Sequence, residues 1–165
     1  MHIERYEKLW IYAFVVMLAV FVAALMAGAI LFNVRVPGSA GLMNPADIPN
    51  SEFANPGVRD MGDGNYNVYV VARMWAFQPS EIVLPEGANV TFYVTSADIT
   101  HGFIIEHHNA NLEVIPGVIG TTRVTFPSAG TFKLQCHEYC GRGHQLMHID
   151  IIVEETQVAL AANEE

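Results

Sequence analysis

The sequence predicts one membrane-spanning helix followed by one all-β domain with the form of a β-sandwich or β-barrel. The first observation is a single apolar run at residues 9–32, which raises the apolar share of the 165-residue chain to 52%. The second is that the remaining residues have the composition of an ordinary globular domain. The third is that β-branched and aromatic runs alternate with proline- and glycine-rich turns after residue 64. Disorder and a multi-spanning architecture are therefore excluded.

Residues 9–32 form the predicted transmembrane helix, since 23 of the 24 residues are apolar and none is charged. A helix of this length spans about 36 Å, more than the roughly 30 Å hydrocarbon core of a bilayer. The run also exceeds the roughly 7–15 residues of a signal-peptide core. Residues 1–8 form the inner flank, whose basic residues favour a cytoplasmic N-terminus. We therefore expect a single-pass membrane protein, with the N-terminus inside and the β domain outside.

Residues 33–64 are expected to form a linker with little regular structure, because proline, glycine and asparagine recur throughout. Residues 65–154 are expected to form the β domain, and residues 155–165 a polar tail. The expected strands are residues 67–73, 81–84, 89–95, 102–106, 112–115, 120–126, 131–135 and 148–153. Many short strands at this spacing are typical of a β-sandwich or β-barrel.

The net charge of −9 lies entirely on residues 33–165, which hold six Lys/Arg and fifteen Asp/Glu. This balance argues against nucleic acid as a partner, because phosphate binding requires basic side chains. The acidic charge is explained equally well by attraction of a basic protein partner and by simple solubility.

Metal-ligating side chains are concentrated in residues 136–147. Cys136, Cys140, His144 and Met147 follow the spacing C-x3-C-x3-H-x2-M. Thiolate, imidazole and thioether together favour copper among the common metals. A further histidine, His101, lies between two expected strands and could complete the site from across the domain.

Four kinds of site are compatible with this cluster. A Cys136–Cys140 disulfide needs an oxidising compartment. A zinc site of two cysteines and two histidines leaves Met147 unused. A mononuclear blue-copper site needs only one cysteine and leaves Cys136 idle. A binuclear copper centre uses both thiolates as bridges, one imidazole from each of His101 and His144, and axial ligands from Met147 and a main-chain carbonyl. Such a centre has no open position, so it favours electron transfer over substrate chemistry.

The cluster resembles the CuA motif of cytochrome c oxidase subunit II, and the resemblance extends over residues 5–153. It implies a cupredoxin-like Greek-key barrel. It also implies a binuclear copper (CuA) centre with the ligands His101, Cys136, Glu138 through its carbonyl, Cys140, His144 and Met147. Every ligand position of the family motif is filled in this chain.

Two departures from the commonest family pattern concern the membrane helix and the aromatic stretch. A single helix, and the start at residues 6–10, are similar to the ba-type oxidases of the B family. Some members carry tryptophan where this chain has Arg73. We therefore expect electrons to enter around Trp75, Phe77 and the exposed edge of the copper loop.

Two glutamates gain expected roles from the resemblance alone. The Glu138 side chain binds magnesium or manganese at the subunit interface in many relatives. A glutamate at the position of Glu7 is associated with proton uptake from the inner side in B-type oxidases. The alternative for Glu138 is a solvated carboxylate without a metal, and the alternative for Glu7 is a charge at the membrane interface without a role in proton uptake.

The resemblance implies that the chain is the electron-transfer subunit of a proton-translocating haem–copper oxidase. It would pass electrons from cytochrome c to haem in subunit I, where oxygen is reduced to water, and alone it would be an electron carrier. The alternative is the CuA subunit of a membrane nitric oxide reductase, which has the same copper motif. A membrane-tethered copper chaperone is disfavoured because a closed site releases metal slowly. A free-standing nitrous oxide reductase is disfavoured because its chain is much longer and unanchored.

Overall fold

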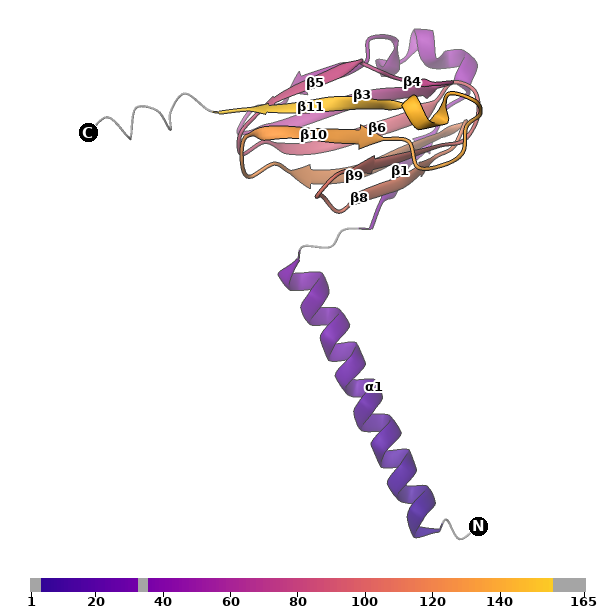
Figure 1. Ribbon diagram of the computed structural model, residues 1–165, viewed down its shortest axis with the longest axis vertical. Helices are drawn as coiled ribbons and strands as arrows, with labels where there is room; N and C mark the ends of the chain where they lie inside the picture. Colours follow the sequence, from indigo (N-terminus) through magenta and orange to yellow (C-terminus); the bar gives the residue numbers. More distant parts are fainter. Residues whose placement is uncertain (1–3, 33–35, 156–165) are drawn as a thin grey trace, which may run out of the picture. The chain divides into compact units, whose positions relative to one another are not determined.

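The computed structural model describes residues 4–32 and 36–155 (Figure 1). The chain divides into two compact units, residues 1–35 and residues 36–165, and each is described by itself. The first unit is the helix α1, Arg5–Leu31. No residue of α1 is buried, and the helix is long and apolar enough to cross a membrane. It begins four residues before the apolar run and so includes Glu7, whose carboxylate accepts a hydrogen bond from the Glu4 N–H at 3.2 Å.

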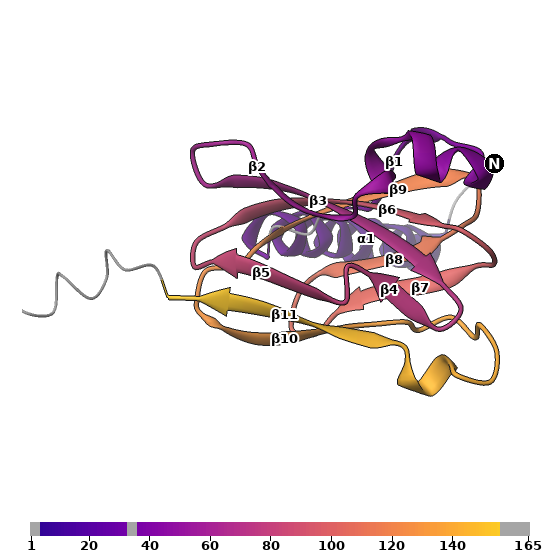
Figure 2. The same ribbon diagram turned by 90° about the horizontal axis from the view of Figure 1, so that it is seen from above.

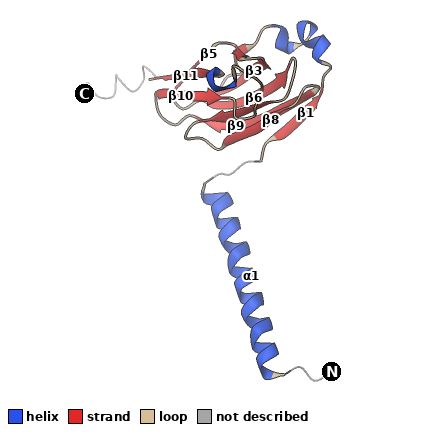
Figure 3. Ribbon diagram, turned by 45° about the vertical axis from the view of Figure 1, so that its right-hand side comes forward, coloured by secondary structure: helices blue, strands red, loops and turns tan. Residues whose placement is uncertain are grey.

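The second unit consists of two β-sheets that face each other (Figures 2 and 3). One sheet has the order β1-β9-β6-β3-β2, with β4 paired to β3, and the other has the order β5-β11-β10-β7-β8. The strands of the first sheet are β1 Gly38–Leu42, β2 Gly57–Asp60, β3 Asn65–Arg73, β4 Ala76–Gln78, β6 Asn89–Ser96 and β9 Val118–Thr125. The strands of the second sheet are β5 Glu81–Pro85, β7 His101–Ile105, β8 Ala110–Val114, β10 Gly130–Gln135 and β11 His148–Glu154.

The strands cross between the two sheets, so that neighbours in a sheet are often distant in sequence. The pairs β3–β6 and β5–β11 are parallel, and the other pairs are antiparallel. Alternate residues point inward to one apolar core. Phe103 is fully buried in this core, with its ring 5.4 Å from that of Phe92 and 6.3 Å from that of Phe77. This core fixes β7, the strand that begins at His101.

The eight strands expected from the sequence are confirmed, each end lying within two residues of the expected position. The short strand β4 was not expected. It contains only three residues and is recognisable only through its pairing with β3. Of the expected polar tail, residues 156–165 lie outside the described residues.

The expectation that residues 33–64 have little regular structure is wrong. Residues 36–64 contain β1, β2 and the 3₁₀ helices η1 Pro45–Asn50 and η2 Glu52–Ala54. The strands β1 and β2 form the two edges of the first sheet. The 3₁₀ helices pack on its outer face, where the ring of Phe53 meets that of Tyr69 edge-on at 5.3 Å. The guanidinium of Arg59 lies 4.2 Å from the centre of the same Tyr69 ring. These contacts hold a segment of poor strand propensity in place, which is why the local sequence did not predict it.

Candidate metal centre

The cysteine-containing loop, residues 136–147, connects two neighbouring strands at one end of the domain. Its base is narrow because β10 and β11 pair as far as Gln135 and His148. The Cys136 N–H then donates to the Met147 carbonyl at 3.0 Å and closes the loop. Inside the loop, Gly141 has φ +111°, a left-handed conformation that favours glycine. The 3₁₀ helix η3, His144–Leu146, turns the chain back towards β11. Residues eleven positions apart in sequence therefore face the same small volume.

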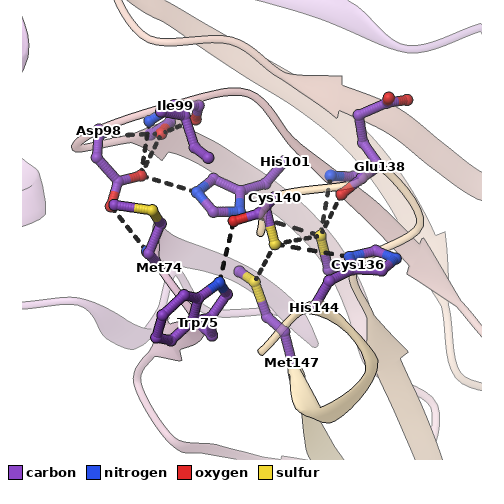
Figure 4. Close-up of polar contacts among 12 residues, drawn as sticks. Met74, Trp75, Asp98, Ile99, His101, Cys136, Glu138, Cys140, His144 and Met147 are labelled. Carbon is purple, nitrogen blue, oxygen red and sulfur yellow. Dashed lines mark hydrogen bonds and ion pairs between the residues drawn. The ribbon is translucent and has the colours of Figure 1, made fainter. Parts of the chain in front are cut away.

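Both cysteines point into this volume, and their sulfur atoms lie 3.7 Å apart (Figure 4). A disulfide requires about 2.05 Å, so both residues are free thiols in this structure. The separation is short enough for one metal to contact both sulfurs, since a metal–thiolate bond is about 2.3 Å. Cys140 is 1% exposed and Cys136 8% exposed, so both sulfurs are shielded from water.

Each thiol has one imidazole beside it. The Sγ of Cys136 lies 4.0 Å from Nδ1 of His101, which enters from the start of β7. The Sγ of Cys140 lies 3.6 Å from Nδ1 of His144, which belongs to the loop itself. His101, Cys136 and Cys140 have ligand atoms within 4.8 Å of one another and could hold a metal ion.

Two weaker donor groups complete the set. The Met147 Sδ lies 3.6 Å from Sγ of Cys140, and Met147 is 2% exposed. The Cys136 thiol donates to the main-chain carbonyl of Glu138 at 3.2 Å. The Glu138 carboxylate points away from the sulfur atoms (Figure 4). All six groups expected to be ligands therefore converge, and this soft, sulfur-rich donor set suits copper.

Asp98, three residues before His101, orients that histidine. Its Oδ1 lies 2.8 Å from Nε2 of His101, the ring nitrogen that faces away from Cys136. Burial of Asp98 opposes its ionisation, but hydrogen bonds from His101 and from the Met74 and Ile99 N–H groups outweigh it. The pKa of the Asp98 carboxyl is therefore held below its usual value. A carboxylate on the outer nitrogen fixes the ring and leaves Nδ1 directed at the sulfur atoms.

Trp75 contacts the loop directly. Its indole Nε1–H donates to the carbonyl of Cys140 at 3.0 Å, and 44% of its surface is exposed. Phe77 is different, because it is 2% exposed and its ring meets that of Phe103 in the core. The expectation that Phe77 shares an exposed electron-accepting surface with Trp75 is therefore corrected. The alternation of β4 points Phe77 inward, while Trp75 precedes the strand.

Gly102 is a site residue that the sequence reasoning missed. Its N–H donates to Sγ of Cys136 at 3.4 Å. A Cβ at this position would lie 2.6 Å from the backbone nitrogen of His137, so any side chain would push the loop away. The only available signal was a glycine immediately after His101 inside an expected strand, which is typical of close backbone approach.

Substituting Gly143 with alanine is expected to displace Trp75. A Cβ at Gly143 would lie 2.6 Å from Cγ of the indole, and the backbone there is compatible with any residue at φ −96°. The indole must move, and its hydrogen bond to the Cys140 carbonyl breaks. Indole emission in a Trp10→Phe background measures this, since the chain has only two tryptophans. Gln145→Ala is the control, and unchanged emission from Gly143→Ala would contradict the contact.

Metal uptake is expected to be strongly pH-dependent. Burial, with a contribution from Cys136, raises the pKa of the Cys140 thiol from 9.0 to about 11. The thiolate is the form that binds metal, so binding must displace this proton. Below pH 11 the apparent affinity should fall about tenfold per pH unit for each proton displaced. Competition titration with a copper chelator between pH 6 and pH 8 measures the slope, and a flat profile would contradict a protonated resting thiol.

Comparison with known proteins assigns the fold and the family. The family model for the periplasmic domain of cytochrome c oxidase subunit II matches residues 63–156. Cytochrome c oxidase subunit 2 of Thermus thermophilus is 37% identical over 158 residues, which cover 93% of this chain and 94% of that one. The alternative cytochrome c oxidase subunit 2 of Bradyrhizobium diazoefficiens is 29% identical over 125 residues, 74% of this chain and 43% of that one.

Two solved structures are similar as well. A chain in the cryo-EM structure of a haem–copper terminal oxidase dimer superposes with a TM-score of 0.75 and 31% identity, covering 91% of this chain and 100% of that one. The periplasmic domain of cytochrome oxidase subunit II of Bradyrhizobium japonicum superposes with a TM-score of 0.52 and 24% identity, covering 59% of this chain and 90% of that one. The second likeness supports the cupredoxin-like fold alone. From the family match and the identity over nearly its whole length, the chain belongs to the cytochrome c oxidase subunit II family.

Proposed function

We propose that this chain is the electron-transfer subunit of a proton-translocating haem–copper terminal oxidase. It would receive electrons from a cytochrome c type donor and pass them to haem in subunit I, where oxygen is reduced to water. The observation that carries the proposal is the convergence of two thiols, two imidazoles, one thioether and one carbonyl on one buried volume. The oxidase role is retained over the nitric oxide reductase alternative, because the matched relatives are named as cytochrome c oxidase subunits.

The donor set supports a binuclear copper (CuA) centre over the other sites considered. Two thiols 3.7 Å apart, with one imidazole beside each, form two similar halves, and neither cysteine is idle. Copper bound there would supply a one-electron redox step. The residues themselves provide a closed, preorganised set of donors, and the burial of Cys140, His101 and Met147 excludes water and substrate. This arrangement suits electron transfer and not substrate chemistry.

The surface beside Trp75 is the proposed place where electrons enter. Met74 is 51% exposed and Trp75 44% exposed, and the indole is bonded to the main chain of a cysteine whose sulfur belongs to the centre. The net negative charge of the chain would attract a basic donor and make association faster at low salt.

The proposal is tested by loading the purified full chain with copper and recording its EPR spectrum with a metal count. One unpaired electron shared by two equivalent coppers gives a seven-line hyperfine pattern, and two coppers per chain are expected. One copper with a four-line pattern would indicate a mononuclear site and would make the chain a simple cupredoxin.

The membrane arrangement follows from the same proposal. The helix α1 would cross the lipid bilayer of the inner membrane, with the N-terminus in the cytoplasm and the metal centre on the periplasmic side. The Glu138 carboxylate, which is exposed and directed away from the sulfur atoms, would be free to bind magnesium or manganese together with groups of subunit I.

Glu7→Gln is expected to slow oxygen consumption by the assembled oxidase while leaving the copper spectrum unchanged, if Glu7 serves proton uptake. Glutamine can still accept the hydrogen bond from the Glu4 N–H, so the start of α1 is preserved. Glu4→Gln is the matched control, since it removes a neighbouring charge. Equal turnover of Glu7→Gln, Glu4→Gln and the unaltered oxidase would remove the proton-uptake role.

A further inference from the structure

Asp98 contacts more than the metal-ligating histidine. Its Oδ1 accepts from the Ile99 N–H at 2.7 Å and faces Nε2 of His101 at 2.8 Å (Figure 4). Its other oxygen, Oδ2, accepts from the Met74 N–H at 2.7 Å. The two oxygens of one carboxylate therefore join His101, at the start of β7, to Met74, which lies twenty-four residues before Asp98.

The carboxylate has little freedom to leave this position. The Asp98 N–H donates to Oγ of Ser96 at 3.2 Å, so the turn before β7 is itself hydrogen-bonded. The Asp98 side chain is only 26% exposed, and the His101 side chain is fully buried. A charged group with three donors in this environment forms short, strong hydrogen bonds.

The Met74–Trp75 segment is also fixed on its other side. The Trp75 indole donates to the Cys140 carbonyl at 3.0 Å and lies against Gly141 and Gly143. One two-residue segment is thus bonded through Asp98 to His101 and through its indole to Cys140. The segment is therefore linked to two of the proposed ligands, His101 at the start of β7 and Cys140 in the loop.

We propose that Asp98 is a positioning residue that holds the metal ligand His101 and the exposed Met74–Trp75 segment in one fixed arrangement. The inference rests on the proposed function for its consequence, since that segment is where electrons would enter. In this arrangement, the position of His101 in the donor set and the position of the Met74–Trp75 segment depend on each other. Loss of Asp98 changes both, although Asp98 contacts neither the sulfur atoms nor the indole.

The test compares Asp98→Asn and Asp98→Ala with the control Asp150→Asn in the full chain. Asparagine keeps one acceptor oxygen, so it can accept a hydrogen bond either from His101 or from the Met74 N–H but not from both. Alanine can accept neither hydrogen bond. Asp150 is a surface carboxylate paired with Lys133 at 3.4 Å, and its substitution removes the same charge. Copper affinity is expected to fall about 10–100-fold in Asp98→Ala, by less in Asp98→Asn, and to stay unchanged in Asp150→Asn.

The second readout is hydrogen exchange of the Met74 amide in copper-free protein, which does not depend on the identity of the metal. Exchange should accelerate at least about tenfold in Asp98→Ala, and indole emission should shift in the Trp10→Phe background. If copper affinity falls while Met74 exchange and indole emission stay unchanged, the joint positioning role is overturned. An unprotected Met74 amide in the unaltered chain overturns it too, even if the Asp98 variants do not fold.

The two proposals fail in distinguishable ways. A mononuclear EPR spectrum from the unaltered chain rejects the binuclear centre but leaves the amide and indole measurements interpretable. A binuclear spectrum with Asp98 variants that match Asp150→Asn in every readout supports the proposed function and rejects the positioning role.

Discussion

Cys140→Ser is expected to abolish the two-thiol centre and, with it, electron transfer through the chain. The Cys140 sulfur lies 3.7 Å from Cys136 Sγ and 3.6 Å from both His144 Nδ1 and Met147 Sδ, so it is the central atom of the donor set. Serine replaces a soft sulfur with a hard oxygen, which suits copper poorly. Its hydroxyl also stays protonated, so it does not replace the thiolate of the proposed centre.

Metal analysis and EPR of the purified chain measure this effect. Met74→Leu is the matched control, since it removes an exposed sulfur atom whose residue lies beside the site but outside the donor set. The control should retain the copper content and spectrum of the unaltered chain. A Cys140→Ser variant with two coppers and the original spectrum would falsify the proposed role of Cys140 as a copper ligand.

Phe103→Ala is expected to lower the free energy of unfolding of the β domain by about 3–5 kcal/mol. The Phe103 side chain is fully buried and its ring contacts those of Phe92 and Phe77 from across the core. Alanine removes this apolar contact area and leaves a cavity that the surrounding strands fill only in part. The loss is a large share of the roughly 5–15 kcal/mol that stabilises a typical domain.

Urea unfolding of the copper-free chain, followed by circular dichroism in the β-sheet region, gives this free energy. Leu42→Ala is the control, because Leu42 is 84% exposed and its loss should change stability by about 0.5 kcal/mol or less. A decrease below about 1 kcal/mol for Phe103→Ala would show that the core relaxes around the missing ring. If Phe103→Ala lowers the free energy of unfolding by the expected amount, the variant should also retain copper less well, since His101 begins the strand that contains Phe103.

Local patterns were sufficient to predict eight of the strands, β3 and β5–β11. In β6 and β9, β-branched and aromatic residues alternate between the core and the outside. This alternation, with a period of two residues, can be recognised from the sequence alone. The apolar run of α1 was equally clear, because no charged residue interrupts it. The four groups of the loop between Cys136 and Met147 were also visible as a motif, since a short loop brings neighbouring residues together whatever surrounds it.

Other regions of the fold could not be predicted from local patterns, because their structure depends on contacts between residues distant in sequence. The segment from Gly38 to Asp60 has weak strand propensity, and its two strands form only because β1 pairs with β9 and β2 pairs with β3. The inward direction of Phe77 was also not recognisable, because a three-residue strand is too short to show a period. Sequence reasoning therefore assigned Phe77 to a surface when it belongs to the core.

The sequence by itself determined the helix, the class of the domain and the four donor groups of the loop, because these depend on composition and on short-range spacing. Only the tertiary structure decided that His101 meets the loop, that one carboxylate of Asp98 joins His101 to the Met74 backbone, and that the Trp75 indole lies on Cys140. The contacts of the Met74–Trp75 segment connect residues 24 and 65 positions apart. Their formation depends on the packing of two sheets around a shared core, which no local pattern specifies.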